Sequence, residues 1–507
     1  MAGLPPLELK DIQGDVLVGL SKKTEIFHFF QIKDAKAFKP QLKNLVPHIT
    51  TADKATGEKE EIKRFRVQRR EKVEAGDANT AKAALSIVGV NISFSHLGLV
   101  QLIGEAKAKE INDDLFIGGQ KKDAKDLHDR GKTDGDKFTP AWDAAFLKDI
   151  HGVILITGDS FDSVSQKLNE VKRVFSKDGV SSITDVATLA GDVRPGDQKG
   201  HEHFGYKDGI SNPRVDVSSL PKALPGQTTI KQGVALLGRP GDDVAFKVGT
   251  PVVRPKWALD GSFLAFRKLP QLVPEFDKFL VNNAKTDVVN QSTPNVFDDF
   301  PDAPSATDIL GARFVGRWKS GAPIRATPLA DDLKLATDEL RNNKFRFNKN
   351  SQEACPFAAH IRKMNPRKDV DQETGLNPHL ILRRGIPFGP EVTSQEKVTN
   401  STQHERGLYF VSYQSNLANG FSFLQKAWAN NSGFPIGTTI VPGLDPLIGQ
   451  EDLADPKDVR DMSGYDDDDV TKRLKFDRRW VESKGGEYFF SPSIPTLSEV
   501  LTTATPS

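Results

Sequence analysis

Apolar residues in the first half of the chain fall into short runs and into stretches with a helical period. Runs at residues 25–32, 85–90 and 153–156 are rich in β-branched and aromatic side chains, which is typical of strands. Apolar positions across residues 161–174 recur every three or four residues, so this stretch is predicted to form a helix with one buried face. Another helix is expected to begin near Ser95, soon after the second run.

The second half of the chain repeats this alternation. Strands are predicted at residues 262–267, 408–413 and 487–490, and helices at 273–280 and at about 417–429. Strands that alternate with helices indicate a mixed α and β fold. The pattern leaves open whether neighbouring strands run parallel or antiparallel.

Loops are expected where the alternation is interrupted. Residues 219–241 are rich in Pro, Gly and Lys and are interpreted as a linker or a long surface connection, which predicts two domains, 1–220 and 221–507. A second loop is expected at residues 283–307, which are rich in Asn, Asp, Pro and Ser. The acidic run 466–469 is interpreted as a solvated loop, because a metal site needs ligands that converge from several directions.

Composition narrows the classes of function. The 507 residues carry 69 basic and 68 acidic side chains, a net charge of +1, so a nucleic-acid partner is not expected. No apolar run is long enough to span a membrane, and the first residues do not have the pattern of a secretory signal. The single cysteine, Cys355, excludes an intramolecular disulfide, so the fold must depend on its apolar core.

Three short segments carry candidate chemistry. Asp208 lies between two glycines in residues 203–213, where glycine permits a tight bend of the backbone. His360 lies among apolar residues and is followed by basic ones, so one stretch offers a metal ligand, an apolar wall and cations. Arg383 ends an apolar run and enters a turn rich in Gly and Pro. Each segment alone is more simply explained by an ordinary turn, a core histidine or a solvated strand end.

Together the three segments supply what a haem peroxidase requires, namely an axial ligand, an acid–base group and a cation beside the leaving oxygen. In these motifs the chain resembles the dye-decolourising peroxidase family. Its Gly-x-x-Asp-Gly motif stands at residues 205–209, the proximal-histidine segment at 355–367 and the distal-arginine segment at 382–389. The order and spacing of the motifs also match, and the resemblance continues over nearly the whole chain.

The resemblance implies an α+β fold of two ferredoxin-like domains, each an antiparallel sheet flanked by helices, which together form a dimeric α+β barrel-like body. It implies haem b as the cofactor, hydrogen peroxide as the oxidant, and bulky dyes, phenolics and other aromatic compounds as reductants. The larger members of the family are usually secreted, so an extracellular location is expected, with a cytoplasmic one left open. The oligomeric state, monomer or homodimer, cannot be inferred from the sequence.

The resemblance also implies a role for each site residue. His360 is the axial ligand of the haem iron, Asp208 the acid–base residue and Arg383 the distal cation. The remaining haem-pocket residues are Leu408 and Phe410 as distal walls, Asp445 as the hydrogen-bond partner of His360, and Arg362 and Arg317 as partners of the propionates. Because an aspartate stays ionised at acidic pH, where a histidine would be protonated, peroxide activation is expected to persist in acid.

Bulky dyes cannot enter a pocket sized for peroxide, and the resemblance implies that a surface tryptophan, Trp428, carries electrons to them. An indole in this amphipathic setting is also suited to packing a helix onto the core. Trp480, Tyr409 and Tyr413 are alternative relays. The carboxylates of Asp369, Asp371 and Glu373 follow the proximal segment and suggest a site where Mn(II) is oxidised, since hard oxygen ligands suit manganese.

Two other functions compete with the peroxidase. A haem carrier or an iron-releasing protein would need His360 but neither Asp208 nor Arg383, so the presence of both favours the enzyme. Related folds that form oxygen from chlorite lack the aspartate of the Gly-x-x-Asp-Gly motif, which counts against that reaction.

Overall fold

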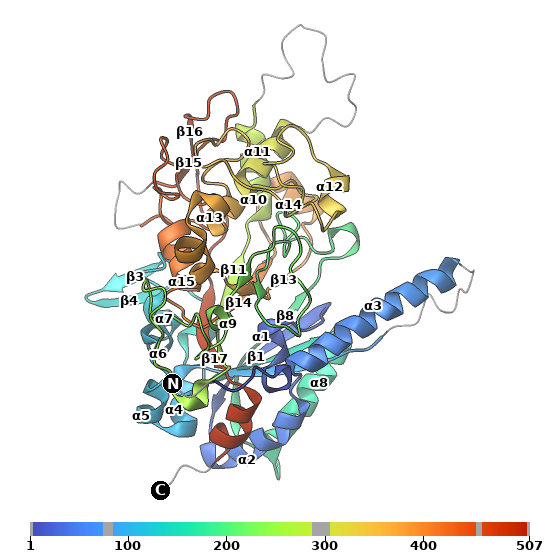
Figure 1. Ribbon diagram of the computed structural model, residues 1–507, viewed down its shortest axis with the longest axis vertical. Coiled ribbons are helices and arrows are strands. Elements are labelled where there is room, and N and C mark those ends of the chain that lie inside the picture. The colour runs from blue at the N-terminus through green and yellow to red at the C-terminus, as the bar shows by residue number, and fades with distance from the viewer. Residues whose placement is uncertain (1–3, 75–84, 286–304, 453–458, 504–507) are drawn as a thin grey trace.

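The computed structural model describes residues 4–74, 85–285, 305–452 and 459–503. A nine-stranded sheet runs through the described part of the chain, with helices on its outside (Figure 1). The first half of the chain contributes β1 (Thr24–Ile32), β2 (Gly89–Phe94), β5 (Gly152–Gly158) and β8 (Ile183–Asp192). The second half contributes β11 (Ser262–Pro270), β12 (Leu382–Arg383), β13 (Ile386–Phe388), β14 (Gly407–Gln414) and β17 (Gly485–Ser491).

Both halves of the sheet have the same topology. The strands lie in the order β12-β14-β11-β17-β2-β5-β1-β8, and β13 pairs with β14 beside β12. Within each half the fourth strand lies beside the first, the first beside the third and the third beside the second, and the pairings are antiparallel. This is the ferredoxin-like order, so the expected fold of two ferredoxin-like units is confirmed. The two halves join where Phe490 of β17 pairs with Phe94 of β2.

Helices cover the sheet. In the first half, α2 (Ala35–Leu45) and α8 (Phe161–Val174) follow the first and third strands. Helix α8 begins at a capping box on Ser160 and buries Val164, Leu168 and Val171, as its apolar period predicts. In the second half the corresponding helices are α10 (Val273–Asn283), and α15 (Phe421–Phe423) with the π-helix Leu424–Ala429.

The remaining elements are shorter or lie at the periphery. The helices are α1 (Gly14–Leu17), α3 (Ala52–Glu74), α4 (His96–Ile103), α5 (Glu105–Lys109), α6 (Asp114–Gly118), α7 (Gln120–Asp123), α9 (Gln232–Ala235), α11 (Ala306–Val315), α12 (Leu333–Thr337), α13 (His360–Met364) and α14 (Ser394–Thr399). The strands form the pairs β3 (Gly131–Asp134) with β4 (Lys137–Pro140), β6 (Ser176–Lys177) with β7 (Val180–Ser181), β9 (Arg214–Val215) with β10 (Thr229–Ile230), and β15 (Asp461–Ser463) with β16 (Arg473–Lys475).

Several predicted elements differ from the observed ones. The strand expected at residues 85–90 begins only at Gly89, because residues 85–88 make no ladder. The helix expected at about 417–429 begins at Phe421 and continues as a π-helix. The edge strand β8 was missed because much of it is exposed or half-exposed and carries polar residues. Helix α3 was missed because its sequence is dominated by charged side chains and has no apolar stripe.

The loop predictions are correct only in part. In the expected linker 219–241, residues 230 and 234–237 are buried, because Val234 and Leu237 form backbone hydrogen bonds with Ser415 and Gly261. Of the loop expected at 283–307, residues 286–304 lie outside the described residues. The acidic run 466–469 is solvated at Asp468, but Asp466 is buried and forms ion pairs with Lys285 and Lys472.

No helix in the described ranges has both the length and the apolar content to cross a membrane. The domain boundary at residue 220 stays a prediction.

Candidate active site

A cavity of about 260 Å³ lies between segments from both halves of the chain. Asp208 reaches it from the first half, before the expected boundary at residue 220. His360, Arg383, Leu408, Phe410 and Arg317 reach it from the second half. Six of the residues singled out from the sequence therefore meet at one place, although they are spread over about two hundred positions of the chain.

His360 is held by Asp445 at one wall of the cavity. It is the first residue of α13, and its Nδ1 lies 2.8 Å from Oδ2 of the fully buried Asp445. Because a carboxylate can only accept, Nδ1–H donates, and Nε2 is the ring nitrogen available to a metal. Burial alone would lower the pKa of His360, but the charge and hydrogen bond of Asp445 raise it above its ordinary value.

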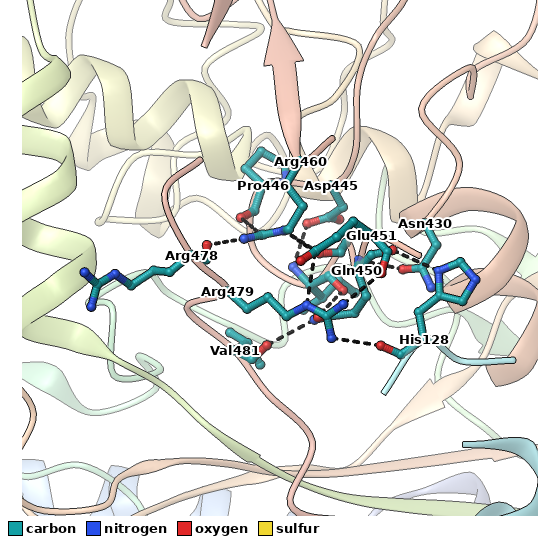
Figure 2. Close-up of polar contacts among 12 residues, drawn as sticks. His128, Asn430, Asp445, Pro446, Gln450, Glu451, Arg460, Arg478, Arg479 and Val481 are labelled. Carbon is teal, nitrogen blue, oxygen red and sulfur yellow. Dashed lines mark hydrogen bonds and ion pairs between the residues drawn. The ribbon is translucent and has the colours of Figure 1, made fainter. Parts of the chain in front are cut away.

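The loop that carries Asp445 is fixed from behind. Oδ1 of Asp445 accepts hydrogen bonds from the backbone N–H groups of Leu447 and Ile448 at 2.9 and 3.0 Å. Burial raises the pKa of Asp445, but the hydrogen bond and charge of His360 and these two N–H groups lower it below its ordinary value. Figure 2 shows Arg460 beside this loop, where it donates to the carbonyl oxygens of Gly449 and Pro446 at 2.9 and 3.1 Å. Asp445 is thus held as an ionised acceptor in a fixed place.

Asp208 and Arg383 form a second polar pair in the same cavity. Nη1 of Arg383 donates to Oδ1 of Asp208 at 2.8 Å. Gly205 and Gly209, which flank Asp208, have φ values of 92° and 79°, so both need the left-handed conformation that glycine adopts without strain. Burial raises the pKa of Asp208, but Arg383 and the N–H of Gly209 outweigh it and lower the pKa below its ordinary value. Asp208 is therefore an ionised base within reach of a fixed cation.

The sheet provides the apolar wall beside this pair. Leu408 and Phe410 of β14 lie opposite Leu269 and Arg267 of β11 in the antiparallel register. Side chains at paired positions point to the same face of a sheet, and all four of these residues line the cavity. Leu408 and Phe410, the distal walls expected from the sequence, thus line the cavity, and their role toward the haem stays a prediction.

Of the two arginines expected to bind propionates, the structure brings one to the cavity. Arg317 lies on its wall, and burial lowers the pKa of Arg317 to about 9. Arg362 does not line the cavity, so this prediction is wrong. Its guanidinium is fully buried, forms an ion pair with Asp369 and donates to the carbonyl oxygens of Ser351, Cys355 and Asn348. These partners use the donors that a propionate would need.

The expected surface tryptophan is not at the surface. Trp428 is 2% exposed, and its ring stacks on Phe434 with the centroids 4.8 Å apart. Its other ring neighbours are His379, which lines the cavity, at 5.6 Å and Phe423 at 5.4 Å. The alternative relays Trp480, Tyr409 and Tyr413 are buried as well. The apolar period of this segment reflects packing of the indole against the core, the second role that its amphipathic setting allows.

The carboxylates proposed for Mn(II) do not converge. Asp369 is buried in its ion pair with Arg362, while Asp371 caps its own helix by accepting from the N–H groups of Glu373 and Thr374. In the described ranges the acidic residues whose ligand atoms approach one another closely enough for a metal are Asp466, Asp467 and Asp468, and these already bind Lys285. The prediction of a manganese site at 369–373 is therefore wrong.

Sequence reasoning missed several polar residues of the cavity, among them Glu202 and Gln271. Glu202 and Gln271 both line it, and their side chains are hydrogen-bonded to each other at 2.6 Å. Glu202 lies only three positions before the first glycine of the Gly-x-x-Asp-Gly motif, which was the one available signal. Gln271 follows directly after β11, and nothing in its local sequence distinguishes it from a surface glutamine.

The residues of the cavity fit a haem group. A histidine with one ring nitrogen fixed by a carboxylate is the usual form of an axial ligand, and apolar side chains such as Val315, Leu408 and Leu447 supply walls for a flat macrocycle. Arg317 adds a cation for an acidic substituent. With a carboxylate and an arginine paired in the same cavity, the fold and site define a peroxidase.

Comparisons with known proteins agree. Residues 11–195 match the model of the DyP dimeric alpha+beta barrel domain, and residues 311–434 match that of the Dyp-type peroxidase, C-terminal. Peroxidase 2 of Mycetinis scorodonius is 41% identical over 98% of this chain and 88% of its own length. The solved structure of an ancestral D-type dye decolorizing peroxidase is 46% identical and superimposes with a TM-score of 0.84, covering 98% of this chain and 100% of that one. A dye-decolorizing peroxidase in complex with 2,6-dimethoxyphenol is 38% identical, with a TM-score of 0.79 and the same coverage of both chains.

The chain belongs to the dye-decolorizing peroxidase family. It is a haem-dependent enzyme that uses hydrogen peroxide to oxidise dyes and other aromatic reductants.

Proposed function

We propose that His360 ligates the iron of one haem b, that Asp208 moves the protons of hydrogen peroxide and that Arg383 stabilises the charge on its leaving oxygen. The observation that carries these assignments is the 2.8 Å hydrogen bond between Arg383 and Asp208 in the same cavity as the His360–Asp445 pair. Arg317 is assigned to a haem propionate, and Leu408 and Phe410 to the wall that excludes bulk water.

The proposed roles follow from the charges of the side chains. A bound haem would supply the site where peroxide binds and the electrons for cleavage of its O–O bond. Asp208, which Arg383 keeps ionised, accepts a proton from the first peroxide oxygen and returns it to the second, so that the O–O bond breaks with water as the leaving group. Arg383 donates to the oxygen on which negative charge grows. Asp445 keeps the imidazole of His360 oriented and electron-rich.

Aromatic reductants that cannot enter the cavity require a route for electrons to the surface. Trp428 remains the proposed relay, but as a buried one, because it contacts His379 on the cavity wall. Phe423 contacts both His379 and Trp428, and Phe246, which is 70% exposed, packs on Phe423 with the ring centroids 5.6 Å apart. A dye that docks against Phe246 would thus be separated from the indole by two aromatic rings, those of Phe246 and Phe423. The proposed physiological activity is oxidation of bulky plant-derived aromatic compounds outside the cell.

The first test is the optical spectrum of the haem-loaded protein before and after one equivalent of hydrogen peroxide. Wild type is expected to change its haem spectrum rapidly, and Asp208→Asn to react more slowly by roughly 10²- to 10⁴-fold, the usual contribution of a general acid–base residue. Asp197→Asn, an exposed aspartate nearby in the chain, serves as the control and should react like wild type. An Asp208→Asn protein that reacts as fast as wild type would overturn the assignment of Asp208. Failure of the wild-type protein to bind haem would overturn the assignment of His360.

A further inference from the structure

The loop that carries Asp208 depends on side chains for its shape. Residues 200–209 contribute no helix and only an isolated bridge between His201 and Lys207. Within the loop, the N–H of Glu202 donates to the carbonyl of Tyr206 at 3.0 Å, and the N–H of Asp208 donates to that of Gly200 at 2.9 Å. The N–H groups of Gly205 and Lys207 donate to the carbonyls of Glu202 and Lys319, and those of Phe204 and Tyr206 are left to be satisfied by a side chain.

The carboxylate of Glu202 satisfies two of them. Its Oε2 accepts from the N–H of Phe204 at 2.9 Å, and its Oε1 accepts from the N–H of Tyr206 at 2.8 Å. The loop therefore wraps around the carboxylate three residues before the Gly-x-x-Asp-Gly motif and continues into it. Both oxygens are used by backbone donors, so an amide in their place could satisfy only one of the two N–H groups.

Gln271 ties this carboxylate to the sheet. Its Nε2 donates to Oε2 of Glu202 at 2.6 Å, while its Oε1 is buried without a hydrogen-bond partner. The backbone N–H of Gln271 donates in turn to Arg406 at 2.8 Å. His203 adds a second tie, since its Nε2 lies 2.8 Å from the carbonyl oxygen of Phe388 in β13, the strand that follows the Arg383 segment. The loop of the first half is thus fastened to the two strands that flank β14.

The donors to the carboxylate of Glu202 are neutral. The hydrogen bonds to its carboxylate come from two peptide N–H groups and one amide, and burial raises the pKa of Glu202 above its ordinary value. A desolvated carboxylate costs free energy unless its hydrogen bonds are strong. Glu202 lines the cavity, so the free-energy cost of burying its carboxylate is explained if this carboxylate sets the geometry of the site.

We infer that Glu202 is a positioning residue of the peroxidase, which shapes the Gly-x-x-Asp-Gly loop so that Asp208 stays against Arg383. It acts through the backbone of Phe204 and Tyr206 and needs no contact with peroxide. Gln271 is its partner on the sheet. This inference rests on the proposed role of Asp208.

The test compares haem-loaded wild type with Glu202→Gln. Loss of one backbone hydrogen bond is expected to speed amide exchange in residues 203–209 at least tenfold, as followed by hydrogen–deuterium exchange. The same change should shift the acid limb of the pH–rate profile for the reaction with hydrogen peroxide to higher pH. The reason is that an Asp208 that has moved away from Arg383 regains a higher pKa. Loss of the Glu202 charge without movement of the loop would shift this limb to lower pH instead, so the direction separates positioning from electrostatics.

Glu275→Gln is the matched control. Glu275 also accepts from a backbone N–H, that of Thr402, at 2.8 Å, but its other oxygen faces the hydroxyl of Thr402, which can accept from an amide as well as donate. This variant should leave both readouts unchanged. If Glu202→Gln does not fold, Gln271→Leu tests the same inference, with faster exchange of residues 203–209 and an acid limb at higher pH expected.

Unchanged exchange, or an acid limb that stays in place or moves to lower pH, would overturn the role of Glu202. Failure of wild type itself to react with peroxide would count against the proposed function and not against the loop. Amide exchange reports on the loop in either case, so the two failures are distinguishable.

Discussion

Arg383 and Asp208 are 175 positions apart in the chain, yet Nη1 of the arginine donates to Oδ1 of the aspartate at 2.8 Å. The pair is held on both sides. Asn212 accepts from the backbone N–H of Arg383 at 3.0 Å and donates to its carbonyl at 3.2 Å, which fastens the segment after Asp208 to β12. The base and the cation are therefore positioned by the same set of contacts.

The proposed roles of this pair predict how activity depends on pH. Arg383 lowers the pKa of Asp208 against the effect of burial, so the base stays ionised as the pH falls. Arg383→Leu removes this charge and is expected to raise the pKa of Asp208, so the acid limb of the reaction with peroxide moves to higher pH. Stopped-flow rates between pH 2 and 7 measure this shift, with the exposed Arg341→Leu as control. An acid limb at the same pH in Arg383→Leu would show that Asp208 is not the titrating base.

Removal of the Asp445 charge should weaken the bond between His360 and iron. In Asp445→Asn the side chain keeps Oδ1 for the backbone of Leu447 and Ile448 but no longer accepts from Nδ1–H as an anion. Loss of such a partner lowers metal affinity by roughly 10- to 100-fold. Titration of haem into the haem-free protein measures the loss, and Asp477→Asn, at an exposed site, is the control. Equal affinity in the Asp445 variant would exclude this role.

Trp428→Phe separates electron transfer from peroxide chemistry. Phenylalanine preserves most of the packing on Phe434 but oxidises far less readily than indole. Turnover of a bulky dye is therefore expected to fall at least tenfold, while the reaction with hydrogen peroxide keeps its rate. Trp257→Phe changes a half-buried indole that does not line the cavity and should leave both rates as they are. Undiminished dye turnover in Trp428→Phe would show that electrons leave by another route.

Arg362 is expected to matter for stability. Arg362→Met would leave Asp369 as a buried carboxylate without its cation and three carbonyl oxygens without their donor. Breaking a buried ion pair in this way costs roughly 3–5 kcal/mol of the free energy of unfolding. Urea unfolding of the haem-free protein measures this loss, with the exposed Arg346→Met as control. A loss of haem affinity with stability unchanged would instead restore the propionate role.

The sequence alone determined the class of fold and the identity of the central residues. Local pattern was sufficient for β1, β5, β11 and β14, which are short apolar runs buried along most of their length, and for α8, which buries one face with a helical period. The motifs around Asp208, His360 and Arg383 were informative because glycine conformation and residue type are local properties. All three side chains line one cavity.

Only the tertiary structure decided where each side chain points and what it touches. Arg362 and Arg317 look alike in the sequence and both donate to backbone carbonyl oxygens, but Arg362 is paired with Asp369 away from the cavity whereas Arg317 lies on the cavity wall. Trp428 was expected at the surface and is covered by Phe434 and Phe423, and the partnership of Glu202 with Gln271 had no signal in the sequence. Burial and hydrogen-bond partners arise from segments that are distant in the chain and meet only after the sheet has formed, so residue type and local spacing carry no record of them.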